Sequence, residues 1–278
     1  MRAPMSHFSM PPPKIAGGPY VMGVLNVTPD SFSDGGAHDS AAAPHALAML
    51  EAGADIIDIG GESTRPGAEP VDEGQEIARV VPVIAALRAA TKAPLSVDTM
   101  KPGVARAAMA AGAAIWNDVA ALTAPGALET AAALQRPVVL MHMKGEPRTM
   151  QQAPHYDDVV AEVIAFLKQR VAAAEAKGLE DIWVDPGIGF GKTLAHNLAL
   201  LSSVGRIAAE TGRPVVIGAS RKRFIAAIDE RAKDAGRDRL GGSIAAALLA
   251  AQGGAAMVRV HDVAETVQAL KVWRATLP

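Results

Sequence analysis

The stretch YVMGVLNVT (residues 20–28) is an apolar run, rich in β-branched residues, that stops at polar residues. Seven similar runs follow it: ADIIDIGGEST (54–64), APLSVDT (93–99), AAIWNDV (113–119), PVVLMHM (137–143), DIWVDPG (181–187), PVVIGAS (214–220) and AAMVRVHD (255–262). After each run the chain reads as helix, or as loop leading into helix. Strands that alternate with helices indicate a parallel sheet, and continuous apolar runs are typical of strands buried on both faces. We therefore predict an α/β fold, a single-domain (β/α)8 TIM barrel.

Polar residues collect where the runs end. In barrels of this type the loops after the strands line one face and carry the chemistry. The same pattern therefore predicts a site at that face. The residues concerned are Asn26, Thr64, Asp98, Asn117, His142, Asp185, Ser220, Arg259 and His261.

Length and composition limit the possible classes. A chain of 278 residues suits one barrel, which we place at 19–278 after a flexible arm at 1–18, where three consecutive prolines block a helix. A net charge of -2 without long like-charged runs argues against nucleic-acid binding. The absence of cysteine excludes a thiolate nucleophile and a Cys-ligated zinc. No apolar stretch approaches the roughly 20 residues that cross a bilayer, so we expect a cytoplasmic protein without membrane contact.

The glycine-rich segment GIGFGKT (187–193) resembles a phosphate loop, but Pro186 stands where that signature requires glycine. The dinucleotide fingerprint fails as well, because Lys192 takes the place of its third glycine. We interpret these glycines as sharp turns after a strand, which leave Asp185 and Lys192 near the barrel mouth.

The chemistry of the strand ends indicates two kinds of ligand. Asp98, Asn117 and Asp185 offer acceptors and an amide that would form hydrogen bonds with a flat heterocycle rich in donors. The cations of SRKRF (220–224) and the pair Arg259 and His261 could hold a multiply charged anion.

The segments NVTPDSFSDGG (26–36), DIGGESTRPG (58–67), SVDT (96–99), NDV (117–119), LMHM (140–143), DPGIGFGK (185–192), SRK (220–222) and RVHD (259–262) occur in this order. Together they resemble the dihydropteroate synthase family, from about Tyr20 to Trp273. The resemblance implies an enzyme that joins 6-hydroxymethyl-7,8-dihydropterin diphosphate to 4-aminobenzoate and releases diphosphate. It also implies a Mg2+ cofactor and a homodimer.

The resemblance assigns roles residue by residue. The implied pterin ligands are Asp98, Asn117, Met141, Asp185, Phe190, Gly218 and Lys222. The implied diphosphate ligands are Thr64, Arg259 and His261, with Asn26 helping to hold magnesium. The implied aminobenzoate subsite and its mobile loops comprise Thr28, Asp30, Phe32, Asp34, Ser63, Arg65, Pro66 and Ser220, and Phe190 lies beside this subsite as well. The implied catalytic residues are Asn26, Asp98, Asp185 and Lys222. We expect diphosphate to leave before the arylamine attacks, with Asp98 and Asp185 stabilising the pterin cation.

Several alternatives stay open at this point. Lys222 could form a Schiff base, as strand-end lysines do in barrel aldolases. The whole protein could be a corrinoid-dependent methyltransferase module, although the segments 26–36 and 259–262 count against it, or a non-catalytic pterin-binding protein. Asp58 could belong to the site or be a buried partner of backbone groups.

His142 and Asp118 are interpreted as structural. Two departures from the family pattern concern Trp116, where a smaller apolar residue is usual, and Ala120, where a polar one is common. Their effect on pterin packing is left open.

Overall fold

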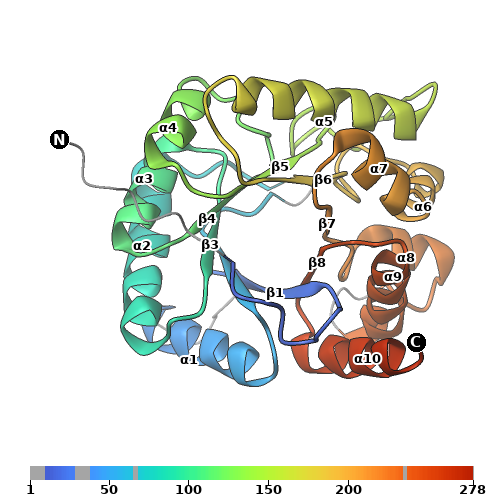
Figure 1. The fold of residues 1–278 in the computed structure, drawn as a ribbon, viewed down its shortest axis with the longest axis horizontal. Helices are drawn as coiled ribbons and strands as arrows, with labels where there is room; N and C mark the ends of the chain where they lie inside the picture. Colours follow the sequence, from blue (N-terminus) through green and yellow to red (C-terminus); the bar gives the residue numbers. More distant parts are fainter. Residues whose placement is uncertain (1–9, 29–37, 65–67, 234–236, 278) are drawn as a thin grey trace.

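Eight parallel strands curve into a barrel with helices around its outside (Figure 1). The computed structural model describes residues 10–28, 38–64, 68–233 and 237–277. The strands are β1 (Tyr20–Asn26), β2 (Ile56–Gly60), β3 (Leu95–Asp98), β4 (Ile115–Asp118), β5 (Val138–Met141), β6 (Ile182–Asp185), β7 (Val216–Ile217) and β8 (Met257–Val260). Each lies inside one of the eight apolar runs, so the predicted TIM barrel is confirmed.

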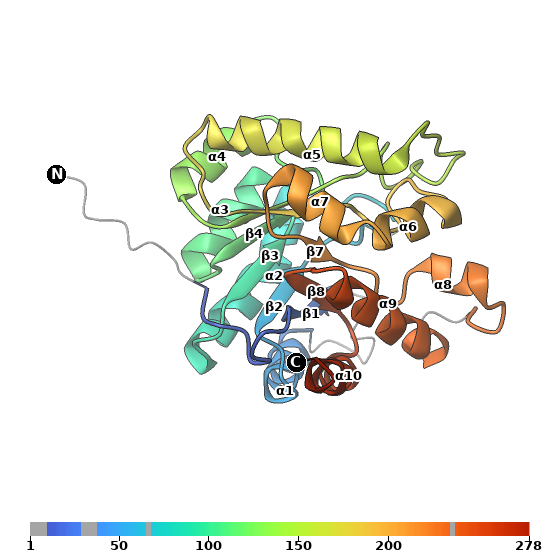
Figure 2. The ribbon, with the colours of Figure 1, turned by 45° about the vertical axis from the view of Figure 1, so that its right-hand side comes forward.

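Helices follow the strands in the order that the sequence predicts. They are α1 (His38–Glu51), α2 (Glu73–Ala90), α3 (Pro102–Ala111), α4 (Ala127–Leu134), α5 (Val159–Glu175), α6 (Leu194–Leu201), α7 (Val204–Thr211), α8 (Arg223–Ile228), α9 (Leu240–Gln252) and α10 (Val263–Ala275), with a short 3-10 helix, η2 (Arg237–Arg239). The side chain of Asp72 accepts from the backbone N–H of Gln75 and caps the start of α2. Figure 2 shows α5 along the outside of the barrel, where it contacts α4, α6 and α7.

The sheet has the order β6-β5-β4-β3-β2-β1-β8-β7, and all paired neighbours run parallel. Within the described residues, β6 and β7 meet through one isolated bridge, between Val184 and Val215. The backbone N–H of Val184 donates to Pro214 O at 3.0 Å beside this bridge. The barrel is therefore closed, and this junction is its most lightly bonded one.

Side chains alternate between the barrel interior and the helices, as strand geometry requires. The inner cluster consists of Met22, Ile56, Ala114, Ile115, Val139, Trp183, Val216 and Met257. Trp116 belongs to the outer cluster, and its Nε1–H donates to Thr99 O at 2.8 Å. The unusual tryptophan therefore packs toward the helices and leaves the inner wall of β4 to Ile115 and Asn117.

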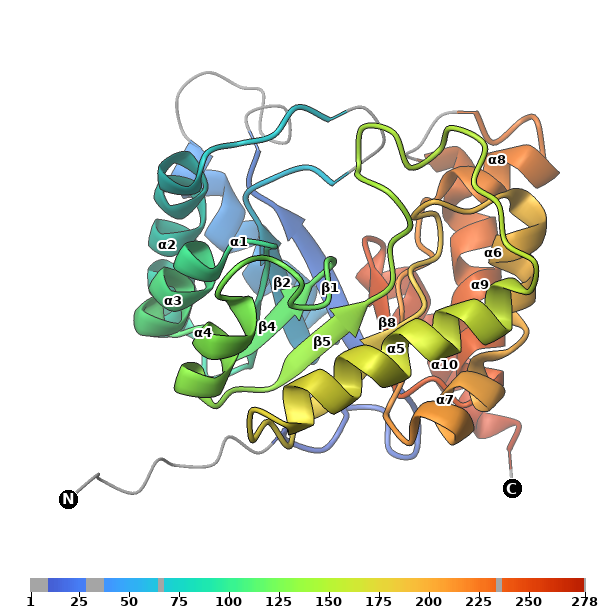
Figure 3. The same cartoon turned by 90° about the horizontal axis from the view of Figure 1, so that it is seen from above.

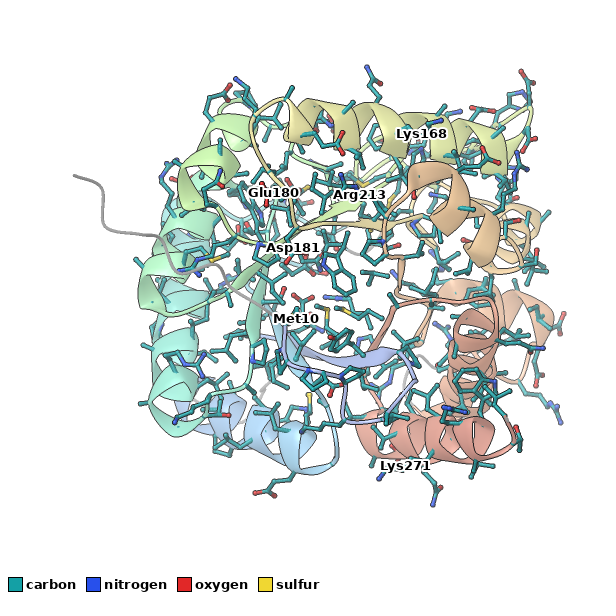
Figure 4. All side chains as sticks on the ribbon, viewed as in Figure 1. Met10, Lys168, Glu180, Asp181, Arg213 and Lys271 are labelled. Atoms are coloured by element: carbon teal, nitrogen blue, oxygen red, sulfur yellow. The ribbon has the colours of Figure 1, made fainter. Side chains whose placement is uncertain are left out.

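The N-terminal segment lies against the amino ends of the strands. Met10 packs on the inner cluster and lies near the middle of the ring of strands in Figure 4. Asp55 accepts from the backbone N–H groups of Lys14 and Val21, both at 2.8 Å. The predicted arm at 1–18 thus has a fixed part around Lys14 and Ile15. Residues 1–9 lie outside the described residues, and the domain boundary stays a prediction.

The loops after the strands gather at the opposite end. Figure 3 shows the barrel from the side, with the N-terminal segment at the lower edge and the loop between β5 and α5 at the upper edge. Among the helices of the described ranges, none is long and apolar enough to cross a bilayer.

Candidate active site

The carboxyl ends of the strands bring four predicted site residues to the inside of the barrel mouth. Asp98 ends β3, Asn117 lies on β4, Asp185 ends β6 and Arg259 lies on β8. Asn117 and Asp185 are buried, while Asp98 and Arg259 keep a small exposed fraction. Each comes from a different strand, so the barrel itself sets their mutual geometry.

Arg259 is the centre of an ion-pair network. Its Nε lies 2.6 Å from Asp58 Oδ2, and its Nη2 lies 2.7 Å from Asp98 Oδ2. The Asn117 side-chain amide donates to the same Asp58 oxygen at 3.0 Å. Asp58 is fully buried, and the partners of its Oδ2 among the described residues are the side chains of Arg259 and Asn117.

Burial controls the protonation of the carboxyl groups. Burial raises the pKa of Asp98 to about 7, against the opposing effect of the Arg259 guanidinium. Burial also raises the pKa of Asp185, while the backbone N–H of Gly187, at 2.7 Å, and the charge of Lys222 oppose the shift. Burial therefore disfavours the charged form of both carboxyl groups, and the neighbouring donors and cations oppose this effect.

Some buried oxygen atoms of the network have no hydrogen-bond partner among the described residues. They are Oδ1 of Asp58 and Oδ1 of Asp98, and Oγ of Ser96, opposite Asp58 on β3, is a third such atom beside the network. All three side chains occupy interior positions of β2 and β3. Because a buried polar atom without a partner costs free energy, this end of the barrel suits a ligand rich in N–H donors.

An apolar wall faces this polar network. Val119, Met141, Met150 and Phe190 form a buried cluster, with Met100 and Met143 packed against it. Lys222 Nζ lies 4.1 Å from the centroid of the Phe190 ring. A flat ring placed here would meet apolar surface on a face and charged groups at its edges.

A buried lysine supports the loop after β6. Lys192 Nζ lies 3.0 Å from His142 Nδ1 and donates to Phe190 O at 2.9 Å. Burial lowers the pKa of Lys192 to about 7 and that of His142 to about 3. The His142 ring is therefore neutral and its Nδ1 accepts, in agreement with the structural interpretation of this residue.

The loops after β7 and β8 are tied together. Ser220 Oγ accepts from the backbone N–H of His261 at 3.2 Å and lies 3.1 Å from His261 Nδ1. Arg221 pairs with Asp262, and its Nε lies 3.0 Å from Oδ2. These contacts hold Ser220 beside His261, on the loops that follow β7 and β8.

The remaining predicted residues lie in the first two loops. Asn26 ends β1 opposite Gly60 of β2, and Thr28, Ser63 and Thr64 are half-buried nearby in the chain. The predicted residues Asp30, Phe32, Asp34, Arg65 and Pro66 lie outside the described residues.

Asp118 has a structural role, as interpreted from the sequence. It is fully buried, and its carboxylate accepts from the backbone N–H groups of Ala120 and Leu122, at 2.7 and 2.8 Å.

Comparisons with known proteins agree with this geometry. The family of pterin binding enzymes matches residues 22–261. Dihydropteroate synthase of Escherichia coli (strain K12) is 49% identical over 263 residues, which cover 93% of this chain and 92% of that protein. The structure of Xanthomonas albilineans dihydropteroate synthase with 4-aminobenzoic acid matches with a TM-score of 0.88 and 55% identity, covering 94% of each chain. The structure of the Xanthomonas albilineans enzyme in complex with 7,8-dihydropteroate matches with a TM-score of 0.84 and 52% identity, covering 94% of this chain and 95% of that one.

Proposed function

This chain belongs to the pterin binding enzymes, in the dihydropteroate synthase family, and on that premise we propose a role for each side chain at its barrel mouth. The reaction is the condensation of 6-hydroxymethyl-7,8-dihydropterin diphosphate with 4-aminobenzoate, which gives 7,8-dihydropteroate and diphosphate in folate biosynthesis. The observation that carries the assignment of roles is the buried network of Asp58, Asp98, Asn117 and Arg259.

The pterin edge meets the carboxylates in this proposal. Asp98 and Asp185 accept from its N–H groups, and Asn117 adds an amide. Gly218 lies beside the same groups, since a Cβ atom there would stand at an ordinary contact distance of 3.8 Å from Asp185 Oδ2 and from Arg259 Cβ. Met141 forms part of the wall on which the ring packs.

Lys222 acts as a cation in this arrangement. Its ammonium group lies over Phe190, and its charge opposes the rise in the pKa of Asp185. We assign it to the polar edge of the pterin opposite the carboxylates. A Schiff base is not required, since the reaction displaces diphosphate from a methylene carbon and involves no carbonyl carbon.

The diphosphate meets the cationic side of the mouth. Arg259 and His261 come from β8 and the loop after it, and Ser220 fixes the orientation of His261. Thr64 adds a hydroxyl from the loop after β2. Ser220 and the described loop residues Thr28 and Ser63 are assigned to the aminobenzoate side.

We propose that the protein and the diphosphate of the substrate bind magnesium together. The described residues contain no group of three or more His, Asp or Glu side chains that could hold a metal ion. Mg2+ is commonly bound by one or two protein oxygens together with substrate phosphates, so the amide oxygen of Asn26 suffices on the protein side. When bound, the ion would neutralise charge on the departing diphosphate.

The protein contributes electrostatic stabilisation to the chemical step. As the bond between the pterin methylene and the diphosphate oxygen breaks, positive charge spreads over the pterin beside Asp98 and Asp185. Negative charge grows on the diphosphate beside Arg259 and His261. The aminobenzoate nitrogen then attacks the methylene and loses its proton afterwards, so no covalent nucleophile or dedicated general base is assigned.

We also propose a homodimer. Leu198 of α6, Ile228 of α8 and Leu249 of α9 are exposed, and α6 contacts both α8 and α9. Light scattering of the purified protein tests the proposal, and a monomeric mass at micromolar concentration would contradict it.

One assay tests the function directly. The purified protein is incubated with dihydropterin diphosphate and Mg2+, with and without 4-aminobenzoate, and diphosphate and dihydropteroate are measured. We expect dihydropteroate only when both substrates are present. Pterin binding without product would favour a non-catalytic pterin-binding protein, and no binding would contradict the proposed site.

A further inference from the structure

The turn that follows β4 has an unfavourable backbone conformation. Ala121 has a φ angle of 53° and Leu122 one of 57°, so two consecutive residues with a Cβ atom lie in the left-handed region. Residues other than glycine adopt this region at a cost in free energy. Such a turn persists only where its surroundings hold it in place.

Two charged side chains hold this turn from opposite sides. The Asp118 carboxylate accepts from the N–H groups of Ala120 and Leu122. Arg170 donates from Nε to Ala121 O at 2.8 Å and from Nη2 to Leu122 O at 2.9 Å. The carboxylate therefore binds N–H groups of the turn, and the guanidinium binds the carbonyls of both left-handed residues.

Arg170 reaches the turn from a distant part of the chain. It lies on α5, outside the barrel, and 48 positions separate it from Leu122. Its half-buried side chain contacts Ala121 and Leu122, which belong to the outer cluster, whereas Val119 belongs to the cluster of the apolar wall.

The turn determines where part of the pterin wall lies. It begins at the end of β4, where Asn117 is the penultimate residue of the strand and bonds Asp58 inside the barrel through its amide. Val119 follows two positions later, and it is buried in the cluster with Met141 and Phe190. A change in the turn would displace Val119 and Asn117 together, on the apolar and the polar side of the pterin.

We propose that Arg170 is a positioning residue for pterin recognition, which holds the strained turn so that Asn117 and Val119 keep their places in the pocket. This inference deepens the proposed function and rests on it. The role is specific for the pterin half of the reaction, because none of the residues assigned to the aminobenzoate side belongs to the turn.

The main test is Arg170→Met, which keeps the aliphatic stem and removes both hydrogen bonds. We expect KM for dihydropterin diphosphate to rise about tenfold, because two hydrogen bonds to the turn are lost, while KM for 4-aminobenzoate stays unchanged. Arg170→Lys, which can restore one of the two bonds, should give an intermediate value. Lys168→Met changes an exposed residue of the same helix, labelled in Figure 4, and serves as the matched control without effect.

A second substitution separates positioning from general stability. Glycine adopts a positive φ at little cost, so Ala121→Gly in the Arg170→Met background should restore most of the affinity for the pterin substrate. Ala121→Gly alone should behave like the wild type. A loss and a recovery confined to KM for the pterin substrate, with KM for 4-aminobenzoate unchanged throughout, is the result that a loss of overall stability would not give.

Calorimetric titration with dihydropterin diphosphate measures the same effect without turnover. An unchanged dissociation constant in Arg170→Met, or equal changes in both KM values without rescue by glycine, would overturn the inference. A wild-type protein that binds the pterin but forms no dihydropteroate would instead contradict the proposed function, and the titration would still decide the role of Arg170.

Discussion

Arg259 donates its Nε–H to Asp58 Oδ2 across 2.6 Å, although 201 positions of the sequence separate the two residues. They lie on β8 and β2, the strands on either side of β1. The pair therefore joins the first and last parts of the barrel from the inside. Asp98 accepts from the same guanidinium, which places one buried cation between two carboxylates.

Removal of Asp58 should destabilise the fold. Asp58→Ala leaves Arg259 with one carboxylate fewer in a buried site, and we expect the free energy of unfolding to fall by about 3 kcal/mol. The control is Asp229→Ala, which removes the partner of the exposed Arg231 and should change the free energy of unfolding much less, because solvent weakens an exposed ion pair. Urea denaturation of both variants measures the difference, and equal losses would contradict the importance of the inner pair.

Ionisation of Asp98 should appear in the pH dependence of the reaction. Its pKa is raised to about 7, and the proposed mechanism requires the charged form. We therefore expect kcat/KM for the pterin substrate to rise as the pH increases through 7. Asp98→Asn should lower activity and remove this rise of kcat/KM with pH. If the variant showed the same rise, the rise would belong to another titrating group.

Asp98 also affects the stability of the fold, and its contribution falls with rising pH, whereas activity rises. Its pKa in the folded protein lies above its value in the unfolded chain, about 4, so the folded protein binds the additional proton between these pH values. The contribution of Asp98 to stability is thus present at low pH and is lost as the pH rises toward 7. Chemical denaturation of the wild type and of Asp98→Asn across this range should show the difference in slope.

Asp185→Asn should test the negative charge of Asp185, because the substitution hardly changes the shape of the side chain. An asparagine oxygen can still accept from the backbone N–H of Gly187, so the turn is kept while the negative charge is lost. We expect kcat to fall by about 100-fold or more, as for other groups that stabilise charge in a transition state. Asp181→Asn, at the amino end of the same strand, is the control. Full activity of the Asp185 variant would exclude its proposed role.

Two glycines with similar backbone angles should respond differently to alanine. Gly187 has a φ angle of 70°, and its Cβ atom would lie 1.9 Å from His142 O. Gly178 has a φ angle of 80°, with no atom within 4 Å of the added carbon. Gly178→Ala should cost about 1 kcal/mol in unfolding free energy, from backbone strain alone. Gly187→Ala should cost clearly more and reduce activity, and similar losses in both variants would contradict this account.

Removal of magnesium should stop the reaction without unfolding the protein. Because Asn26 is the one protein ligand proposed, chelation by EDTA should abolish diphosphate release and leave the thermal unfolding temperature unchanged. Added Mg2+ should restore turnover, and Asn26→Ala should require a higher concentration of the ion. Persistent turnover in EDTA would rule out the metal.

The sequence predicts most of the fold because strand burial is visible in it. All eight apolar runs contain a strand, and the period of two that places Asp98 inside the barrel also places Asn117, Asp185 and Arg259 there. Asp58 follows the same period, but its partner lies on the last strand, and no local pattern identifies that partner. Its role therefore became visible only in the folded chain.

Other supporting residues carry no local signal at all. Arg170 looks like an ordinary polar residue of a surface helix, and its target is two backbone carbonyls, which any sequence supplies. The contact between Lys192 and His142 joins residues 50 positions apart. The effect of Trp116 on pterin packing was left open by the sequence, and its position in the strand alternation directs it to the helices.

Within the described residues, β6 and β7 are joined by a single bridge, so the ladders of the closed barrel begin at β6 and end at β7. Every other junction between neighbouring strands is a continuous ladder within β1 to β6 or between β1, β8 and β7. A break in the chain at Gly212, just before β7, would thus separate a fragment with six paired strands from one with two. The edges of β1 and β8 are the surfaces on which these fragments would reassemble. The protein can in this way be divided into two complementing parts, with Asp185 in one part and Arg259 in the other, so that activity would report their association.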